Sequence, residues 1–322
     1  MTGKHFDLGF TCQAKGEDIF LQEVKRLARK YRISWLNVPK GRSAAFRKCV
    51  DEGRLKINVF LNTQLDGVSL ENPSLLLLRS LKEKNCLVVE DADDVRIYAD
   101  KALQLSYLKR AALPVPRYFV INGMKGNRYQ DATSRHFTQG STWLARPAMG
   151  MNHHPVVINT RAPIQQALVK AGCNPGRRML IYKYYKPLTK GNRVLSFRIW
   201  YLFGHVVPCW YKHGDHLPAM LKPGDISSSL IARLVNLVTK ISEITLLDWF
   251  VTDLVVTNGR KGERVIIQEP ANALAGFGPG MKRLRSLPHE VIRIAANRIV
   301  EVAWRKAHNL PLADGTTINL LQ

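Results

Sequence analysis

Strand and helix patterns alternate along the first hundred residues of the chain. Strands are expected where apolar residues alternate with polar ones or form short runs, at 6–10, 33–36, 55–61 and 86–89. Helices are expected at 19–31 and 73–84, where apolar residues recur at helical spacing. Parallel strands need crossover connections, so this alternation predicts a small parallel sheet covered by helices, an α/β arrangement.

The rest of the chain predicts a mixed α/β (α+β) organisation. Further strands are expected at 118–121, 142–146, 156–158, 179–182, 195–203 and 205–211. Further helices are expected from Asp100 to the prolines at 114 and 116, and at 163–171, 228–244 and 288–307. With 322 residues, 46% of them apolar, the chain can form about two domains with substantial cores.

Residues 249–269 have the pattern of a β-hairpin with one carboxylate on each strand. A strand at 249–256 is followed by a polar turn at 257–263 and a second strand at 264–269. If pairing is symmetric about Lys261, Asp253 faces Glu269 on a surface that is otherwise apolar. Opposed side chains lie about 4.5–5.5 Å apart at Cβ, where like charges repel.

On the hairpin alone, two interpretations of this carboxylate pair are open. A divalent cation would relieve the repulsion, and Mg²⁺ favours one or two protein carboxylates together with the phosphates of a substrate. Alternatively, both side chains are solvated carboxylates near strand ends that bind nothing.

Positive charge is concentrated in the middle third of the chain. The net charge is +23, and residues 101–200 contain 17 lysines and arginines but only one acidic residue, Asp131. This asymmetry produces a positive potential suited to polyphosphate, an anionic substrate or nucleic acid. A basic composition spread evenly over the chain does not account for it.

The cysteines indicate a reducing compartment. Cys12, Cys49, Cys86, Cys173 and Cys209 are scattered, with no Cys-x-x-Cys pair and no His/Cys cluster at zinc spacing. The first residues lack the apolar core of a signal peptide, and the apolar runs are too short to span a bilayer. We therefore expect a globular protein of the cytoplasm with no membrane segment.

Several short motifs follow one another in a fixed order from Asp100 onwards. They are Asp100-Lys101 with Leu113-Pro114-Val115-Pro116, then Trp143–Gly150, Met179–Lys183, Arg193–Trp200 and Glu269-Pro270-Ala271-Asn272. In this order they resemble the ATP-grasp superfamily, in particular its peptide-ligase-like branch of carboxylate–amine ligases. The resemblance extends from Asp100 to about Ala303, and the preceding region is similar to the domain that usually comes before this fold.

The resemblance implies a domain organisation. An ATP-grasp domain at 99–310 would follow a small parallel-sheet α/β domain at 1–98 and precede a tail at 311–322. Within it, 115–182 would cover the nucleotide and 183–310 would hold the metal and the substrates.

The resemblance also implies a role for each candidate residue. Mg²⁺ would be held by Asp253, Glu269 and Asn272, and ATP by Lys101, Arg146, Tyr182, Lys183 and Arg198, with Lys101 and Arg198 also acting in catalysis. Lys212, His213 and the loop 276–280 are candidates for substrate contact. A lysine ammonium binds phosphate as a point charge, whereas the planar guanidinium of arginine can donate two parallel hydrogen bonds to its oxygens. Taken singly, each candidate also has a structural explanation. The lysines and arginines can be exposed surface cations, the strand 179–183 an ordinary core strand, and Asn272 a turn residue.

The chain departs from the family pattern at three places. The usual strand lysine is Arg146, which keeps the charge but changes the geometry. The loop 148–154 has one glycine, so few of its backbone N–H groups can bind phosphate without strain. His153 and His154 in this loop are expected to contact phosphate or substrate, or to be exposed. Asp253 replaces a more usual glutamate, and its shorter side chain requires a metal closer to its strand.

The function that the resemblance implies is ATP-dependent ligation. A small-molecule or peptide carboxylate would be joined to an amine through an acyl phosphate, with Mg-ATP as co-substrate. Two alternatives are a polyanion or nucleic-acid binding protein of the same fold without turnover, and phosphoryl transfer to an acceptor other than a carboxylate. The basic middle segment favours an anionic partner, although it lacks a recognisable RNA-binding motif.

Overall fold

The structure is a computed structural model, and it describes most of the chain. The described residues are 3–12, 19–39, 41–62, 72–122, 141–149, 155–159, 178–211, 218–259, 262–272 and 288–312. Within these ranges, none of the helices combines the length and the apolar content that a bilayer crossing requires.

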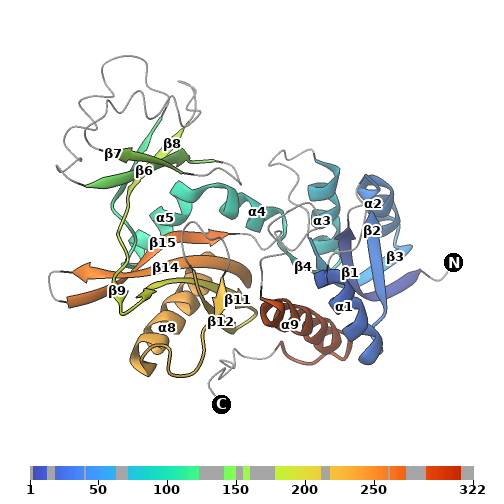
Figure 1. Ribbon diagram of the computed structural model, residues 1–322. Helices are drawn as coiled ribbons and strands as arrows, with labels where there is room; N and C mark the ends of the chain where they lie inside the picture. Colours follow the sequence, from blue (N-terminus) through green and yellow to red (C-terminus); the bar gives the residue numbers. More distant parts are fainter. Residues whose placement is uncertain are drawn as a thin grey trace. The chain divides into compact units, whose positions relative to one another are not determined.

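Helices and strands alternate from β1 to α4, and the described elements from β5 to β13 are all strands (Figure 1). The helices are α1 (Ile19–Lys30), α2 (Ser43–Asp51), α3 (Pro73–Glu83), α4 (Ala92–Ala99), α5 (Lys101–Arg110), α8 (Ser228–Thr245) and α9 (His289–Ala307). The strands are β1 (Lys4–Cys12), β2 (Trp35–Pro39), β3 (Leu55–Leu61), β4 (Leu87–Val89), β5 (Tyr118–Ile121), β6 (Thr142–Pro147), β7 (Val156–Asn159), β8 (Met179–Lys183), β9 (Thr189–Lys190), β10 (Arg193–Val194), β11 (Ser196–Leu202), β12 (His205–Trp210), β13 (Ala219–Met220), β14 (Trp249–Gly259) and β15 (Gly262–Asn272).

The chain forms two compact units, each assembled from segments that are distant in the sequence. The first comprises 1–96, 197–251 and 272–322, and the second comprises 97–196 and 252–271. The described strands include a five-stranded sheet in the order β13-β12-β11-β14-β15.

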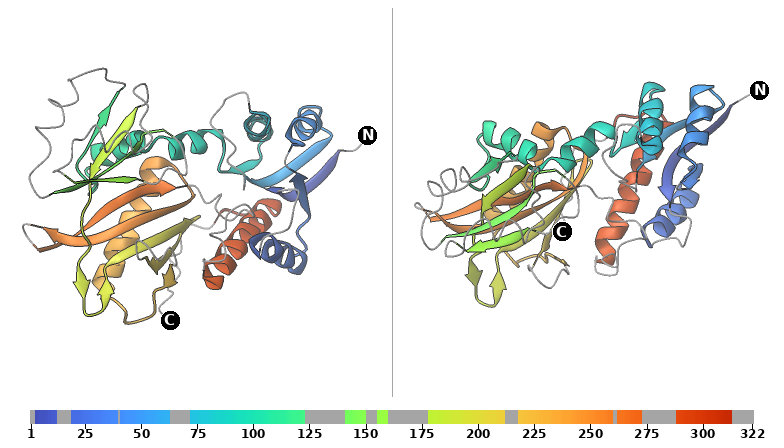
Figure 2. Two further views of the ribbon diagram at one scale, coloured as in Figure 1. Left: turned by 45° about the horizontal axis from the view of Figure 1, so that its top comes forward. Right: turned by 90° about the horizontal axis from the view of Figure 1, so that it is seen from above.

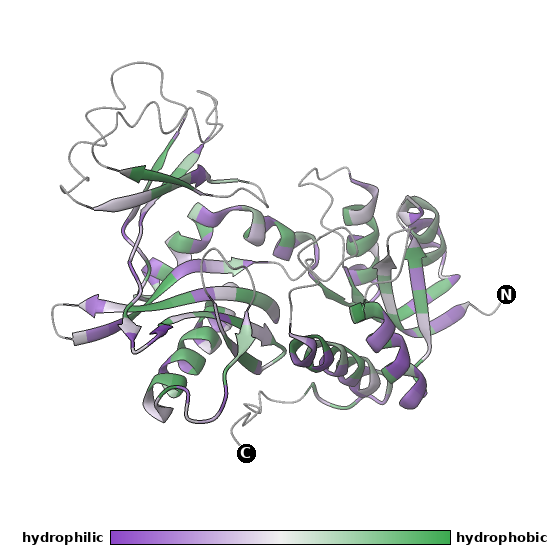
Figure 3. Cartoon of the chain, in the orientation of Figure 1, coloured by the Kyte–Doolittle hydropathy of each residue, from purple (hydrophilic) through white to green (hydrophobic). Residues whose placement is uncertain are grey.

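The first unit contains the predicted parallel sheet. Its strand order is β2-β1-β3-β4, and each neighbouring pair is parallel, as predicted. Helix α9 packs against α1, β1 and β3, and Figure 2 shows it alongside α1. Apolar stretches of α9 are visible in Figure 3, and Val291, Ala295 and Ile299 are fully buried there. The last described helix therefore completes the core over the sheet formed by the first strands of the chain.

A buried arginine of α9 holds the turn between β11 and β12. Phe203 has φ 49° and Gly204 has φ 85°, as a two-residue hairpin turn requires. Arg298 Nη2 donates to the Phe203 carbonyl oxygen at 2.6 Å, and Nη1 donates to Glu301 at 2.9 Å. Because Arg298 is only 2% exposed, these acceptors are needed to compensate its charge.

The second unit contains an antiparallel sheet in the order β5-β8-β6-β7. Helix α5 begins at Lys101, because the Asp100 side chain accepts a hydrogen bond from the Leu103 N–H and caps the first turn. The Lys101 N–H donates to the Ala148 carbonyl oxygen at 3.0 Å, just after β6. The first residue of α5 is therefore held close to the end of β6.

Local patterns predicted most of these elements, with some corrections. The expected strand at 33–36 begins later, at Trp35, because Ile33 N–H donates to Ala28 O and closes the end of α1. The turn expected at 257–263 is shorter, since β14 extends to Gly259 and β15 begins at Gly262. Helices α2 and α4 were not predicted. The helix expected at 163–171 lies outside the described residues.

Replacing Arg298 tests the hairpin contact. Arg298→Met keeps an apolar stem but removes both donors, so we expect a loss of about 2–4 kcal/mol in the free energy of unfolding. Arg305→Met is the matched control, because Arg305 pairs with the same Glu301 at 2.9 Å but is 29% exposed. That control should lose about 1 kcal/mol or less in urea unfolding. Equal losses for the two variants would contradict the role of the Phe203 contact.

Candidate functional site

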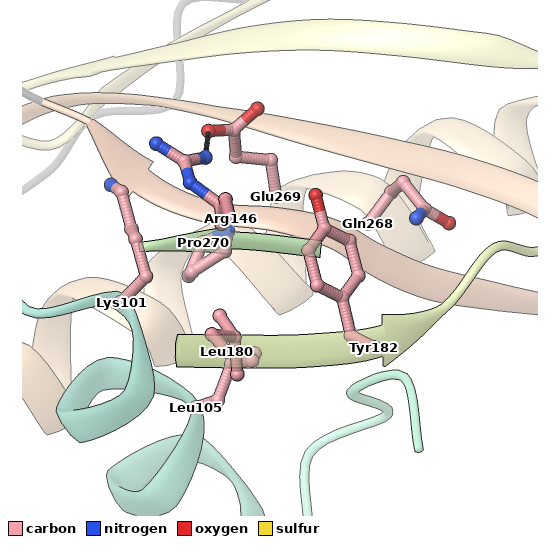
Figure 4. A pocket seen from close by; sticks show the side chains of 8 residues that line it. All are labelled: Lys101, Leu105, Arg146, Leu180, Tyr182, Gln268, Glu269 and Pro270. Atoms are coloured by element: carbon pink, nitrogen blue, oxygen red, sulfur yellow. Dashed lines mark hydrogen bonds and ion pairs between the residues drawn. The ribbon is translucent and has the colours of Figure 1, made fainter. Parts of the chain in front are cut away.

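A small cavity in the second compact unit brings together side chains from four elements (Figure 4). Its lining consists of Lys101 and Leu105 of α5, Arg146 of β6, Leu180 and Tyr182 of β8, and Gln268, Glu269 and Pro270 of β15. Its volume of about 10 Å³ has room for about one water molecule. Four of the residues predicted from the sequence, Lys101, Arg146, Tyr182 and Glu269, therefore meet at one place.

Arg146 and Glu269 form an ion pair in this cavity. Arg146 Nη1 lies 2.7 Å from Glu269 Oε1, and the side chains are 5% and 24% exposed. Burial lowers the pKa of Arg146, but Glu269 and Tyr182 outweigh this effect and raise it, so the guanidinium stays charged. Glu269 therefore faces a positive charge, which the predicted hairpin with two carboxylates on an apolar surface did not include.

Lys101 is a buried amine beside this ion pair. It is 2% exposed, and its Nζ donates to the Ala271 carbonyl oxygen at 2.7 Å. Burial lowers its pKa from 10.5 to about 7; Glu269 opposes this decrease and Arg146 adds to it. Near neutral pH the amine is thus present in both protonation states, and a bound anion would favour the ammonium form.

Tyr182 of β8 contributes its side chain to the lining of the cavity. Burial and the charge of Glu269 raise the pKa of the phenol, so the hydroxyl remains protonated at neutral pH. Figure 4 shows the hydroxyl pointing toward the side of the cavity that holds Arg146 and Glu269. It supplies a neutral polar group on the wall opposite Lys101.

Gln268 is a cavity residue that the sequence analysis missed. It is 5% exposed and follows two buried isoleucines, Ile266 and Ile267. Its Oε1 accepts a hydrogen bond from the Tyr185 N–H at 3.3 Å. The only sequence signal was a polar residue inside an apolar strand, which no motif identifies.

The predicted metal ligands are two carboxylates and an amide. Asp253 is 5% exposed on β14, and its charge acts on both Lys101 and Tyr182, although it does not line the cavity. Thr252 Oγ1 donates to the Glu269 carbonyl oxygen at 2.8 Å, which connects the two strands beside the carboxylates. Asn272 ends β15 and belongs to the first unit.

This donor set is compatible with magnesium. Among the described residues, no three or more His, Cys, Asp or Glu side chains gather as a metal site. Mg²⁺ keeps several ligands for water or substrate phosphates and needs only one or two carboxylates from the protein. The oxygen donors therefore fit a magnesium ion that is bound together with phosphates.

Two further predicted residues, Arg198 and Lys183, are not among the described residues that line this cavity. Arg198 is on β11 in the first unit, where its guanidinium carbon stacks 3.8 Å from the centre of the Tyr211 ring. Lys183 follows Tyr182 in the chain but lines a different pocket. Lys212, His213, His153, His154 and the loop 276–280 lie outside the described residues.

A larger pocket of basic character lies on the linker that follows β8. Its volume is about 550 Å³, and it is lined by residues 183–189 with Thr257, Asn258 and Arg264. The Arg264 guanidinium lies 4.9 Å from the Tyr185 ring centre, and Lys183 Nζ lies 5.6 Å from the same ring. The lining includes Lys183, Lys186 and Arg264 but no carboxylate, so it favours an anionic ligand.

Comparisons with known proteins identify the fold. No family model and no curated protein sequence matches the chain. The structure is similar to a RimK domain ATP-grasp protein from Sphaerobacter thermophilus, with a TM-score of 0.60, 14% identity and coverage of 91% of this chain and 98% of the other. It is also similar to D-alanine–D-alanine ligase from Bacillus anthracis, with a TM-score of 0.61, 11% identity and coverage of 94% and 99%.

A third similar structure is the ATP-grasp ligase PsnB in complex with its precursor peptide PsnA2 and AMPPNP. The TM-score is 0.62 at 11% identity, with coverage of 94% of this chain and 99% of the other. These similarities extend over nearly the whole chain. The protein has the ATP-grasp fold, as its sequence predicted, and the predicted mixed α/β class is confirmed.

The lowered pKa of Lys101 predicts how stability depends on pH. Between pH 7 and 10.5 the unfolded chain keeps the lysine proton while the folded chain loses it. The free energy of unfolding of the parent, relative to Lys101→Met, should therefore rise with pH in this window, by up to about 1.4 kcal/mol per pH unit. Urea unfolding at several pH values measures this difference, with Lys84→Met at an exposed position as the control. A difference that stays constant or falls with pH would contradict the burial of the amine.

Proposed function

We propose that this protein is an ATP-dependent carboxylate–amine ligase that forms an amide bond and releases ADP and phosphate. The observation that carries the proposal is the convergence of Lys101, Arg146 and Glu269 in one buried cavity of an ATP-grasp fold. Two cations and a carboxylate at one place suit a polyphosphate and its metal ion. The similar structures include ligases and a complex with an ATP analogue, which supports the same class of reaction.

Each charged side chain has a separate task in this proposal. Arg146 and Lys101 bind the phosphates and neutralise the charge that develops on them during transfer. Asp253 and Glu269, with the amide of Asn272, hold Mg²⁺, which would shield the phosphates and orient the transferred group. Arg198 is proposed as a further phosphate contact, as its place in the motif order implies.

The reaction consists of two displacements. An oxygen of the substrate carboxylate attacks the γ-phosphorus, the bond to ADP breaks, and an acyl phosphate forms. The amine nitrogen then attacks the acyl carbon, phosphate leaves with its electron pair, and the amine loses a proton to form the amide. Most of the rate enhancement in such a reaction comes from positioning and charge neutralisation, which fixed cations in a buried site provide.

Turnover with a pool of acceptors tests the proposal directly. Purified protein, Mg-ATP and pooled amino acids or peptides should release phosphate and yield products whose masses equal acid plus amine minus water. Arg146→Ala should reduce phosphate release about a hundredfold or more, whereas Arg146→Lys should keep part of the activity.

The matched control for this experiment is an ion pair of the same unit outside the cavity. Lys190 lies 2.8 Å from Glu263, and both side chains are exposed. Lys190→Ala should leave phosphate release close to the parent rate. Failure of the parent to bind Mg-ATP at millimolar concentration in calorimetry would refute the proposed ligase.

A second candidate function is the binding of a polyanion such as single-stranded nucleic acid. The basic pocket around Tyr185 favours it, because three cations and two tyrosines line the pocket without any carboxylate. This function and ligation are compatible, because the two cavities have different linings.

Paired alanine substitutions test the basic pocket. Lys186→Ala with Arg264→Ala should weaken binding of a single-stranded RNA and lower the slope of log affinity against log salt by about 1.4, or 0.7 per contact. Arg79→Ala with Lys84→Ala removes the same charge from exposed positions of the first unit. Fluorescence anisotropy at several salt concentrations provides the measurement. Identical slopes for the two double variants would exclude the pocket as the binding site.

A further inference from the structure

The small cavity and the basic pocket are lined by the same two segments of the second unit, which are β8 with its linker, and β15. On the first segment, Tyr182 lines the cavity and the next residue, Lys183, lines the pocket. On β15, Gln268 lines the cavity and Arg264 lines the pocket. Neighbouring Cα atoms of a chain are only about 3.8 Å apart, so ligands in the two spaces would touch adjacent parts of one wall.

A hydrogen bond between a side chain and the backbone connects these two segments. Gln268 Oε1 accepts from the Tyr185 N–H at 3.3 Å, whereas the N–H groups of the two preceding residues donate to carbonyl oxygens at 2.8 and 2.9 Å. Within the described ranges Gln268 Nε2 has no hydrogen-bond partner, although the side chain is only 5% exposed. The bond to Gln268 is thus the longest of the three and holds an amide that is only partly satisfied, so it costs least to break.

The cavity has to widen before phosphate groups enter it. Its volume of about 10 Å³ holds about one water molecule, and a phosphate group is larger. Lys101 and Arg146, the proposed phosphate ligands, are only 2% and 5% exposed. Binding of Mg-ATP therefore requires part of the lining to move, and the weakly held contact between Tyr185 and Gln268 is where movement costs least.

The basic pocket carries cations on both segments of this wall. Lys183 and Lys186 lie on β8 and its linker, and Arg264 lies on β15. The Arg264 guanidinium and the Lys183 amine lie 4.9 and 5.6 Å from the centre of the Tyr185 ring. A single-stranded nucleic acid with a base on this ring and phosphates on the cations of both segments would tie the linker to β15.

We propose that the basic pocket is an inhibitory site, in which single-stranded RNA holds the linker against β15 and so weakens the binding of Mg-ATP at the cavity; this inference rests on the proposed ATP-dependent function. The pocket volume of about 550 Å³ suits a ligand of nucleotide size. The negative charge of the RNA acts in the same direction, because it opposes a second anion nearby. Coupling between two sites is reciprocal, so Mg-ATP weakens the binding of RNA by the same factor.

Calorimetry of Mg-ATP with and without a short oligouridylate, at constant free magnesium, tests this coupling. As RNA is added, the dissociation constant of Mg-ATP should increase about fivefold or more and then level off. Competition of RNA and ATP for one site would instead raise the constant without limit. That outcome would overturn the inference, as would an unchanged constant, whether or not fluorescence anisotropy shows the RNA to be bound.

A substitution on β15 tests whether the RNA acts by joining the two segments. Arg264→Ala keeps the lysines of the first segment, so saturating RNA should still bind while the increase in the dissociation constant falls below twofold. Lys109→Ala is the matched control, because Lys109 Nζ lies 5.5 Å from the centre of the Tyr118 ring, in the same unit but outside the pocket. This control should keep the increase measured for the parent.

The outcomes separate this inference from the ligase proposal. An increase in Arg264→Ala as large as in the parent would overturn the joining of the linker to β15. A parent that binds Mg-ATP equally well with and without RNA would refute the inhibitory site and leave the ligase proposal standing. A parent that binds no Mg-ATP at all would refute both.

Discussion

The ion pair between Arg146 and Glu269 is the interaction on which the candidate site depends. It joins β6 of the sheet β5-β8-β6-β7 to β15, and it places opposite charges in the lining of one cavity. Removing one partner of such a pair is costly, because the other charge is left without compensation. The pair also affects the protonation of its neighbours, because its charges contribute to the pKa shifts of both Lys101 and Tyr182.

The same pair bears on the proposed binding of Mg-ATP. In that proposal a phosphate would compete with Glu269 for the guanidinium and a metal ion would compete with Arg146 for the carboxylate, so a metal–phosphate complex would satisfy both partners at once. An arginine suits this exchange, because its planar fork stays charged and binds two oxygens together. Lys101 complements it as a point charge that gains its proton when an anion is near.

Local patterns allowed much of the fold to be predicted. The strand at 55–61 and the helix beginning at Pro73 have clear periodicity and capping signals, and both are confirmed. Helix α2 was not predicted, although its apolar residues Phe46, Cys49 and Val50 have helical spacing. Gln268 was missed because its significance depends on the Tyr185 N–H, a contact between residues 83 positions apart.

The sequence by itself determined the fold class, the parallel pairing of the first strands and the residue types available to the site, because periodicity and motif order are local properties. Only the tertiary structure decided which residues meet. It placed α9 against β1 and β3, gave Glu269 a positive partner, and removed Lys101 from water. Burial, ion pairing and pKa depend on distances between residues far apart in the chain, and no local pattern encodes those distances.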